Sequence, residues 1–460
     1  MRFTKIIATL GPASSDAETV KKMAEEGMNC IRINTAHGDS DQYRHLVSLV
    51  AENDDVATMI DVKGPEIRIR LEEPRRLEHG DTFKVYFEDG RYPRLNYDVV
   101  DDLEVGEKIF FDDGLITTRI VETTDKAIRL RSSQNALLQP DKGVNIPGKE
   151  LGLPALTEND KRALEFAVEH DIDYVAQSFV RSKKDIHATK DVVGDDPIKT
   201  IAKIENHEGV NNLEEIIDAS DGIMIARGDL GVELPQERVP ALQKQIVRKT
   251  AAKNNISVVA TQMLESMTNN PQPTRAEVSD VANAVLDGAD AVMLSGETAI
   301  GDYPVKTVST MRSVANAIEE DITARFDPGN SSSISEDMSN AAHKVAKRQG
   351  ADALIVVGEG TKQTRLLSRY RLCTPIISVT ETPRVARQLN LVWGAKPILM
   401  DPLPTTEIIP RVAQRAFREG LVEEDDTVVF YAGVGTDDHE EGNLVETHRI
   451  GAFLRYHGLL

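Results

Sequence analysis

The chain has 460 residues, a formal net charge of −21 at neutral pH, 40% hydrophobic and 28% charged residues. An acidic chain is repelled by nucleic-acid phosphates and anionic lipids, so we expect neither nucleic acid nor a membrane as a partner. No run approaches the roughly 20 apolar residues of a membrane span, and the apolar run near the N-terminus is too short for a signal peptide. We therefore expect a cytoplasmic protein. The length exceeds that of one typical domain, so we expect two or three domains.

The first third of the chain changes pattern once. Up to residue 68, β-branched runs alternate with segments of helical periodicity. These predict strands at Lys5–Leu10, Asn29–Ile33 and Val56–Asp61, with helices at Asp16–Glu26 and Gln42–Glu52. From residue 69 to residue 150, short alternating stretches such as Lys108–Phe111 are broken by Gly, Asp and Pro. This second pattern predicts an inserted all-β domain.

Helix and strand alternation resumes at Thr157, which we expect to cap a helix that reaches Glu169. Five further strands are predicted at Tyr174–Phe179, Ile198–Ile204, Gly222–Ala226, Ser257–Thr261 and Ala291–Ser295. Three strands before the insertion and five after it make the eight that a closed parallel barrel requires. The sequence therefore predicts a (β/α)₈ TIM barrel from residues 1–68 and 151–328, with residues 69–150 inserted as a β-barrel lid domain.

A serine-rich linker, Gly329–Ser333, precedes the last part of the chain. Residues 334–460 alternate strands and helices again, which predicts a doubly wound α/β domain. The strands are expected at Ala353–Val357, Pro375–Val379, Pro397–Met400 and Thr427–Tyr431, and the helices near Asp337–Arg348, Thr361–Tyr370, Pro383–Leu391 and Thr405–Glu419.

Short polar clusters close the hydrophobic runs of the predicted barrel. They are Arg32–Asn34, Asp61–Lys63, Lys203–Glu205, Arg227–Asp229, Thr261–Gln262 and Ser295–Glu297. In a (β/α)₈ barrel all strand C-termini open onto one face, so these clusters should meet at one site. Cations, carboxylates and a threonine that meet there indicate metal-assisted chemistry on an anion.

Lys203 and Glu205 are two positions apart at a strand end, so their side chains face the same way. They are unfavourable to bury unless they bind a ligand or each other, and a buried ion pair is the alternative interpretation. Asp229 follows Gly228, where the backbone can approach a ligand closely and the amides could hold an anion. Glu205 and Asp229 would supply the oxygen ligands that Mg²⁺ or Mn²⁺ prefers.

Other polar residues at the strand ends have two interpretations each. Arg32 and Arg68 could bind phosphate oxygens bidentately, or could be surface arginines. Thr261 could relay a proton, with Glu297 continuing the relay, or its hydroxyl could be hydrogen-bonded at the barrel rim. His37 could contact a nucleotide or cap the helix that follows it.

Several of these clusters belong to long contiguous motifs. The motifs are Thr4–Ser14, Asp61–Arg68, Lys203–Gly209, Ala226–Gly231, Ala260–Met267, Pro273–Glu277 and Ser295–Thr298. They resemble the pyruvate kinase family, and the resemblance runs nearly from end to end. Another barrel enzyme that binds phosphoenolpyruvate would lack the inserted and C-terminal domains. A non-catalytic relative would be expected to have lost Lys203, Glu205 or Asp229.

The resemblance implies an enzyme of glycolysis that transfers the phosphoryl group of phosphoenolpyruvate to ADP, giving ATP and pyruvate. It implies that Lys203 neutralises the transferred group and the enolate, and that Arg32 also binds the phosphoryl group. The amides around Gly228 and Asp229 would hold the substrate carboxylate beside Thr261.

The resemblance also assigns the remaining parts of the site. Thr261 and Glu297 would belong to the route that protonates the enolate. The nucleotide would be bound by Arg68, His37 and Asn34. The inserted β domain would act as a lid that excludes water, which could otherwise accept the phosphoryl group.

The resemblance implies a divalent and a monovalent cation. Glu205 and Asp229 would hold Mg²⁺ or Mn²⁺. Family members that require K⁺ hold it with Asn, Ser, Asp and Thr, and the matching residues here are Asn34, Ala36, Asp61 and Val62. The serine hydroxyl is absent, but Val62 could serve through its backbone carbonyl. Because Glu66 is the residue type of the K⁺-requiring members, we expect K⁺ activation.

The family is typically an allosteric homotetramer, so we expect a homotetramer here. In members activated by sugar phosphates, a Ser/Thr-rich loop follows the first strand of the C-terminal domain. Here that loop is Gly358–Thr364 and contains Glu359, while the distal loop Ala432–Gly442 is acidic. A carboxylate repels a phosphate, so fructose bisphosphate is not expected to activate this protein.

Overall fold

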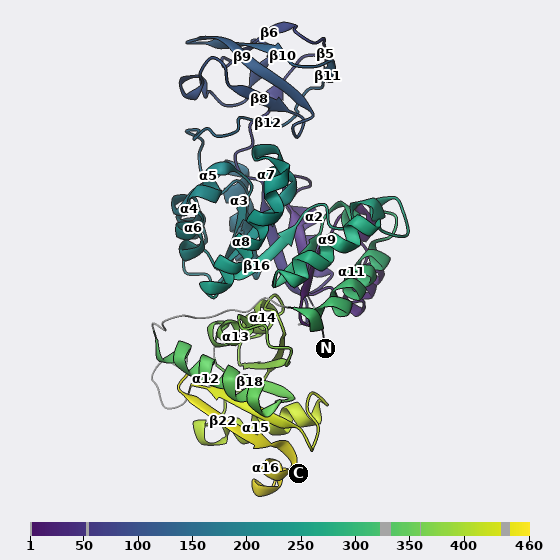
Figure 1. Cartoon of the computed structure of the whole chain (residues 1–460), viewed down its shortest axis with the longest axis vertical. Coiled ribbons are helices and arrows are strands. Elements are labelled where there is room, and N and C mark those ends of the chain that lie inside the picture. The colour runs from purple at the N-terminus through teal and green to yellow at the C-terminus, as the bar shows by residue number, and fades with distance from the viewer. Residues whose placement is uncertain (1, 52–54, 323–332, 359, 434–441) are drawn as a thin grey trace.

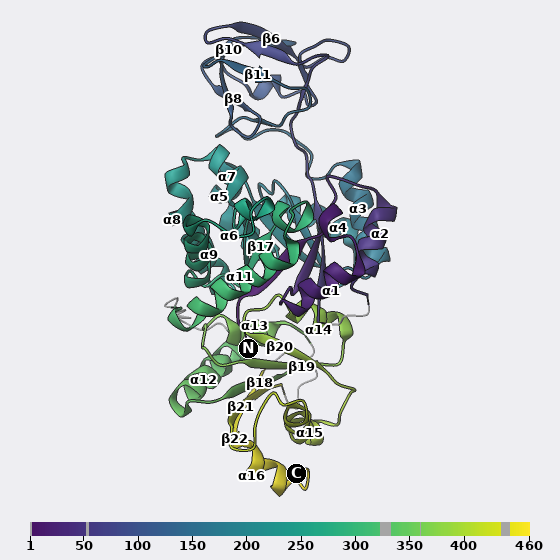
Figure 2. The ribbon, with the colours of Figure 1, turned by 90° about the vertical axis from the view of Figure 1, so that its right-hand side faces the viewer.

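A computed structural model of the chain describes residues 2–51, 55–322, 333–358, 360–433 and 442–460. Three bodies follow one another along its longest axis (Figure 1 and Figure 2). The inserted β domain lies at one end, a barrel lies in the middle, and the C-terminal α/β domain lies at the other end. None of the described helices combines the length and the apolar character needed to cross a bilayer.

The middle body is a closed barrel of eight parallel strands, which confirms the predicted (β/α)₈ TIM barrel. Its strands are Lys5–Thr9 (β1), Cys30–Asn34 (β2), Ala57–Val62 (β3), Tyr174–Gln177 (β13), Lys199–Ile204 (β14), Gly222–Ala226 (β15), Ile256–Ala260 (β16) and Ala291–Leu294 (β17). The pairing of β1 with β17, through Lys5 and Ala291, closes the ring. Helices cover the outside and side chains fill the inside, so both strand faces are buried, which explains the continuous apolar runs.

Helices surround the barrel strands. They are Ala17–Glu25 (α1), Ser40–Ser48 (α2), Glu158–Glu169 (α3), Lys183–Val193 (α4), His207–Asn211 (α5), Leu213–Ala219 (α6), Arg227–Glu233 (α7), Val239–Ala252 (α8), Arg275–Leu286 (α9), Gly296–Ala299 (α10) and Pro304–Ile318 (α11). Thr157 caps α3 as predicted: its side chain accepts a hydrogen bond from the Asp160 amide, and Asp160 returns the contact in a capping box.

The inserted domain is a curved seven-stranded sheet with a separate two-stranded sheet, β11 and β5. Its strands are Ile69–Arg70 (β4), Arg75–Leu77 (β5), Thr82–Tyr86 (β6), Arg94–Leu95 (β7), Lys108–Phe111 (β8), Ile116–Thr124 (β9), Ala127–Ser132 (β10), Ala136–Leu138 (β11) and Val144–Asn145 (β12). A bridge between Arg68 and Gly143 joins the two ends of the larger sheet. The sheet therefore closes around a core that includes Phe83, Phe111 and Leu130.

The C-terminal body is a five-stranded sheet with strand order β20-β19-β18-β21-β22. Its elements are Ile334–Gln349 (α12), Ala353–Val357 (β18), Lys362–Ser368 (α13), Ile376–Thr380 (β19), Pro383–Leu389 (α14), Ala395–Leu399 (β20), Thr405–Arg418 (α15), Thr427–Ala432 (β21), Leu444–Arg449 (β22) and Ile450–Tyr456 (α16). Separate apolar clusters cover its two faces, one with α15 and α16 and the other with α12 and α13. This arrangement confirms the doubly wound α/β domain.

Some predictions for the C-terminal body were incomplete. The antiparallel edge strand β22 and helix α16 were not predicted from the sequence. Glu359, residues 329–332 of the linker and residues 434–441 of the distal loop lie outside the described residues.

The C-terminal body closes the N-terminal end of the barrel. Residues from the end of α14 to the first residue of β20 join the apolar cluster inside the barrel, namely Leu389, Leu391, Val392 and Ala395. The buried Lys5 of β1 donates a hydrogen bond from Nζ to the carbonyl oxygen of Ala395 at 2.6 Å. The barrel floor is therefore built from two parts of the chain that are almost 400 residues apart.

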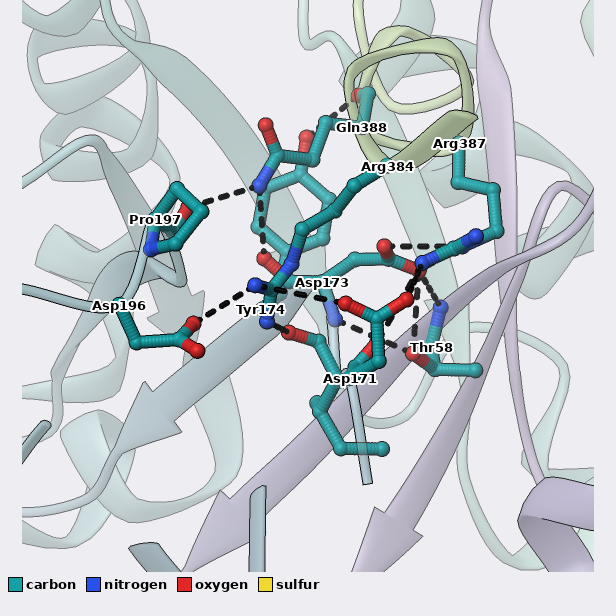
Figure 3. A network of polar contacts seen from close by, with 10 residues as sticks. Thr58, Asp171, Asp173, Tyr174, Asp196, Pro197, Arg384, Arg387 and Gln388 are labelled. Carbon is teal, nitrogen blue, oxygen red and sulfur yellow. Dashed lines mark hydrogen bonds and ion pairs between the residues drawn. The ribbon is translucent and has the colours of Figure 1, made fainter. Parts of the chain in front are cut away.

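Helix α14 supplies two arginines to the charged part of this contact (Figure 3). Arg384 forms an ion pair with Asp196 at 2.7 Å. Arg387 pairs with Asp173 at 3.0 Å and with Asp171 at 2.6 Å. Two arginines of one helix therefore bind carboxylates that precede β13 and β14 in the chain. The interface between the two bodies is both apolar and ionic.

Candidate active site

A cleft lies between the C-terminal ends of the barrel strands and the inserted domain. Phe179, Asp229 and Glu233 line it from the barrel, and Gly143 and Asn145 line it from the insertion. The Asn145 side-chain amide donates a hydrogen bond to Glu233 Oε1 at 3.1 Å. The cleft is therefore bounded on one side by the candidate lid.

Lys203, at the end of β14, is the buried cation at the centre of the site. Its Nζ lies 2.6 Å from Ser178 Oγ, 3.0 Å from Glu205 Oε1 and 3.3 Å from Asp61 Oδ1. Burial would lower the pKa of Lys203, but Asp61 and Glu205 raise it above its ordinary value. The ammonium group is therefore charged, and the buried ion pair considered from the sequence is present.

Arg32 and Asp61 extend this cluster across the ends of β2 and β3. The Arg32 Nε donates to Asp61 Oδ2 at 2.7 Å, and its Nη1 donates to Thr9 Oγ1 at 3.0 Å. Arg32 is buried, so it is not the surface arginine of the alternative interpretation. Burial alone would raise the pKa of Asp61, but Arg32 and Lys203 hold it below its ordinary value. The two cations, Arg32 and Lys203, are thus balanced by two carboxylates, Asp61 and Glu205.

Glu205 and Asp229 are the carboxylates predicted to bind a divalent cation, and both act electrostatically on Lys203. Glu205 is buried, and its Oε2 accepts a hydrogen bond from the Phe179 amide at 2.6 Å. Burial and the neighbouring charge of Glu205 raise the pKa of Asp229 to about 7, against the lowering effect of Lys203. A buried carboxylate beside a half-buried one whose charge is disfavoured fits a divalent cation, which would stabilise the charge on Asp229.

The described residues supply no third ligand of the usual metal-binding types. Among them, no group of three or more His, Cys, Asp and Glu side chains is placed to hold a metal ion. A cation bound by Glu205 and Asp229 would therefore complete its coordination with water and substrate oxygens, as Mg²⁺ commonly does.

The backbone around Gly228 is fixed by Thr261. The Gly228 amide donates to Thr261 Oγ1 at 2.9 Å, and that hydroxyl donates to the Ala260 carbonyl at 2.7 Å. The hydrogen-bonded rim hydroxyl of the alternative interpretation is thus present. Thr261 has φ +66°, a value that β-branched residues rarely adopt. Arg227 holds this strained turn by donating to the Thr261 carbonyl at 2.7 Å.

Glu297 is buried with both carboxylate oxygens engaged by backbone amides. Its Oε1 accepts from Leu264 at 3.1 Å, and its Oε2 accepts from Ser295 at 2.7 Å. These contacts tie the segment after β16 to the end of β17. In this arrangement Glu297 orients the loop that follows Thr261.

The residues predicted to bind nucleotide are spread over the rim. Arg68 donates from Nε and Nη2 to Glu66 Oε2 at 3.0 and 2.8 Å. Lys63 Nζ lies 3.0 Å from the same oxygen. His37 is exposed between β2 and α2. Asp39 caps α2, so the alternative helix-capping role of His37 is wrong.

The residues predicted to hold K⁺ lie together at the ends of β2 and β3. Asn34 Oδ1 accepts from the Ala36 amide at 3.1 Å. The Val62 carbonyl accepts from the Ser178 amide at 3.2 Å, and the Asp61 carboxylate binds Arg32 and Lys203. Because a carbonyl oxygen has two lone pairs, the amide oxygen of Asn34 and the carbonyl oxygen of Val62 can each accept one further interaction.

Three residues at the centre of the site were missed from the sequence. Ser178 binds Lys203, the Phe179 amide binds Glu205, and Thr9 binds Arg32. The signal for Ser178 was a polar residue at the end of a buried strand, but the predicted strand continued to Phe179. The structure ends β13 at Gln177, and Phe179 takes φ +55°.

Known proteins resemble this chain over nearly its whole length. The family model described as "Pyruvate kinase, barrel domain" matches residues 1–308, and "Pyruvate kinase, alpha/beta domain" matches residues 336–448. The chain is 39% identical over 470 residues to the pyruvate kinase of Clostridium acetobutylicum, covering 97% of this chain and 99% of that protein. It is 37% identical over 480 residues to that of Geobacillus stearothermophilus, covering 98% of this chain and 81% of that protein.

Proposed function

Because the chain belongs to the pyruvate kinase family, we infer that it transfers the phosphoryl group of phosphoenolpyruvate to ADP, giving ATP and pyruvate. The observation that supports this site for the reaction is the buried Lys203 ammonium, which lies beside Arg32 and two carboxylates at the barrel mouth. Phosphoryl transfer requires positioning and charge neutralisation more than covalent chemistry. A pre-ordered cluster of cations provides both.

Lys203 and Arg32 would neutralise charge on the transferred group. Both are held by Asp61, at 3.3 and 2.7 Å, so their ammonium and guanidinium groups need little reorganisation when substrate binds. Lys203 would also stabilise the enolate oxygen that develops as the phosphoryl group leaves. The backbone amides around Gly228 and Asp229, at the start of α7, would bind the substrate carboxylate.

Pyruvate kinases use a divalent metal, and we propose that Mg²⁺ or Mn²⁺ is held here by Glu205 and Asp229. When bound, it supplies positive charge that polarises phosphoryl and enolate oxygens. The Phe179 amide orients Glu205 through a 2.6 Å hydrogen bond. The raised pKa of Asp229, to which the charge of Glu205 contributes, supports this assignment.

Protonation of the enolate carbon would use Thr261 at the end of β16. We propose that its hydroxyl delivers the proton from bound water, and that Glu297 keeps the loop after Thr261 in place. Arg68, His37 and Asn34 would bind the nucleotide. The Arg68 guanidinium would have to exchange its contact with Glu66 for phosphate oxygens, which is a charge-matched replacement.

The inserted domain would act as the lid. Its closure would remove water from the cleft, so that ADP rather than water accepts the phosphoryl group. The contact between Asn145 and Glu233 supports this role, because it joins the insertion to the helix that carries Asp229. We also propose that the protein is a cytoplasmic homotetramer, which size-exclusion chromatography with light scattering would test.

The first experiment is a pyruvate assay with phosphoenolpyruvate, ADP and Mg²⁺, in KCl and in NaCl at equal ionic strength. We propose K⁺ activation through Asn34, Asp61 and the Val62 carbonyl, so the expected rate is higher in KCl. Equal rates would remove K⁺ from the proposal and leave the kinase activity. An absence of pyruvate in both salts would contradict the proposed function.

A further inference from the structure

We propose that Ser178 is a positioning residue for Lys203, an inference that rests on the proposed function of Lys203. Ser178 directly follows β13 and is 5% exposed. Its hydroxyl oxygen lies 2.6 Å from Lys203 Nζ and 3.2 Å from Asp61 Oδ1. A hydroxyl group has one proton to donate, so Ser178 donates to Asp61 and accepts from Lys203.

Ser178 completes the hydrogen bonding of the Lys203 ammonium group. That group has three protons, and its three partners are Ser178, Asp61 and Glu205. Ser178 is the nearest of the three and the only uncharged one. Without it, the ammonium group would move toward one of the two carboxylates. The serine therefore holds the cation between the carboxylates, facing the substrate.

The backbone after Ser178 orients the neighbouring carboxylate in the same turn. Phe179 has φ +55°, and its amide donates to Glu205 Oε2 at 2.6 Å. The Val180 carbonyl accepts from the Asn206 side chain at 3.4 Å. The turn formed by residues 178–180 is thus anchored to Glu205 and Asn206, the two residues that follow β14. One loop positions both the cation and a proposed metal ligand.

The test compares Ser178→Ala with Ser178→Thr. Removal of a hydrogen bond to a charged group should lower kcat by about 10- to 100-fold, while KM for phosphoenolpyruvate changes by less than about threefold. S178T keeps the hydroxyl group and should retain kcat within about threefold of the wild type. The matched control is Ser257→Ala, because Ser257 is a buried barrel serine bound to Asp290 at 2.9 Å and lies near the start of β16. Its kcat should be unchanged.

Mn²⁺ binding, followed by water-proton relaxation, separates the cation from the metal ligands. S178A should bind Mn²⁺ within about threefold of the wild type, because Ser178 does not contact Asp229 and the Glu205 bond to Phe179 remains. A loss of affinity above about tenfold would place Ser178 in the metal site and overturn the proposal. If S178A does not fold, Ser178→Gly removes the same hydroxyl group.

Two kinetic outcomes would also overturn the proposal. An unchanged kcat in S178A would show that Lys203 does not need this partner. Equal losses in S178A and S178T would assign the effect to packing. Failure of the wild-type protein to form pyruvate would instead contradict the proposed function, so the two failures are distinguishable.

Discussion

At the scale of single residues, the site consists of buried charges that neutralise one another before substrate arrives. Lys203 contacts two carboxylates, and Arg32 shares one of them. Buried charges are unfavourable unless they are paired, and removal of one partner leaves another uncompensated. A substitution here should therefore affect both activity and local stability, and the measurement must distinguish the two effects.

Lys203→Met should lower kcat by several orders of magnitude, because no other described cation contacts both Asp61 and Glu205. Mn²⁺ affinity should be largely retained, because Glu205 keeps the Phe179 amide and Asp229 is unchanged. Steady-state kinetics and water-proton relaxation measure the two effects. Lys161→Met, which removes an exposed lysine of α3 that pairs with Glu158, is the control and should have wild-type kcat. Near-normal turnover in K203M would contradict the role of Lys203.

The sequence predicted the charged residues of this site better than its uncharged ones. Lys203, Glu205 and Asp229 stand at strand ends, where a buried charge requires an explanation. Ser178 and Thr9 carry no such signal, because serine and threonine are common in buried strands and loops. Their roles depend on which strands are neighbours, and on the positive φ of Phe179, a conformation that phenylalanine rarely adopts.

At the scale of elements, α14 is one of the parts of the C-terminal body that bind the barrel (Figure 3). Asp173 is fully buried and has Arg387 as its ion-pair partner. Burial raises the pKa of Asp173 to about 6, against the lowering effects of Arg387 and of the Thr58 hydrogen bonds. The carboxylate thus depends on Arg387 to remain charged at neutral pH.

Arg387→Met should destabilise the protein by about 3 kcal/mol, because removing one partner of a buried pair leaves the other uncompensated. Denaturant unfolding at pH 7 measures this loss. Arg411→Met is the matched control, because Arg411 is an exposed arginine that pairs with Glu407 on α15. This substitution should lower the free energy of unfolding by less than about 1 kcal/mol. Combining Arg387→Met with Asp173→Asn should recover part of the lost free energy of unfolding. Equal stability of R387M and R411M would contradict the role of Arg387 as the partner of a buried carboxylate.

At the scale of the whole molecule, the joint between barrel and C-terminal body contains one lysine with an unusual pKa. Lys5 is buried, and its pKa is lowered to about 7 by burial, then by Arg2 and Lys396. The unfolded chain has the ordinary value near 10.5. Between these values the unfolded state binds more protons than the folded state, so stability rises with pH from about 7 toward 10.

The stability of the wild type relative to Lys5→Met should therefore increase by about 1–2 kcal/mol between pH 7 and pH 9. Trp393, the single tryptophan of the chain, stacks on Phe3 beside this joint with ring centroids 4.8 Å apart. Its fluorescence during urea unfolding provides the measurement. A difference that stays constant with pH would show that Lys5 does not titrate in this range.

Regulation by fructose bisphosphate is a second property of the whole molecule. We predict that it changes the half-saturating phosphoenolpyruvate concentration by less than about twofold, which is under roughly 0.4 kcal/mol of coupling. The reason is the carboxylate Glu359 in the loop where activated relatives carry Ser or Thr. Substrate saturation curves with and without the sugar phosphate test this, and a large decrease in the half-saturating concentration would refute it.

The overall architecture was predictable because strand and helix periodicities repeat. Eight strand-like runs interrupted by one β-rich segment allow few arrangements, and strands such as Gly222–Ala226 were predicted to the residue. The closure of the barrel floor was not predicted. It depends on contacts such as Lys5 with Ala395, and a single sequence contains no local pattern for partners this far apart. Strand β22 was missed because it is an edge strand with no buried residue, so it lacks the apolar run of the other strands of this sheet.

The ring closure of the barrel has a consequence for synthesis of the chain. A chain emerges from the ribosome N-terminus first, so β1 can pair with β2 early. Its other edge stays unpaired until β17 has been synthesised, because Lys5 pairs with Ala291. Phe3 gains its partner later still, because its carbonyl accepts a hydrogen bond from the Gly394 amide. The first strand to be synthesised is thus among the last barrel strands to have both edges paired. Through most of its translation the nascent protein therefore carries an unpaired strand edge, and such edges promote aggregation.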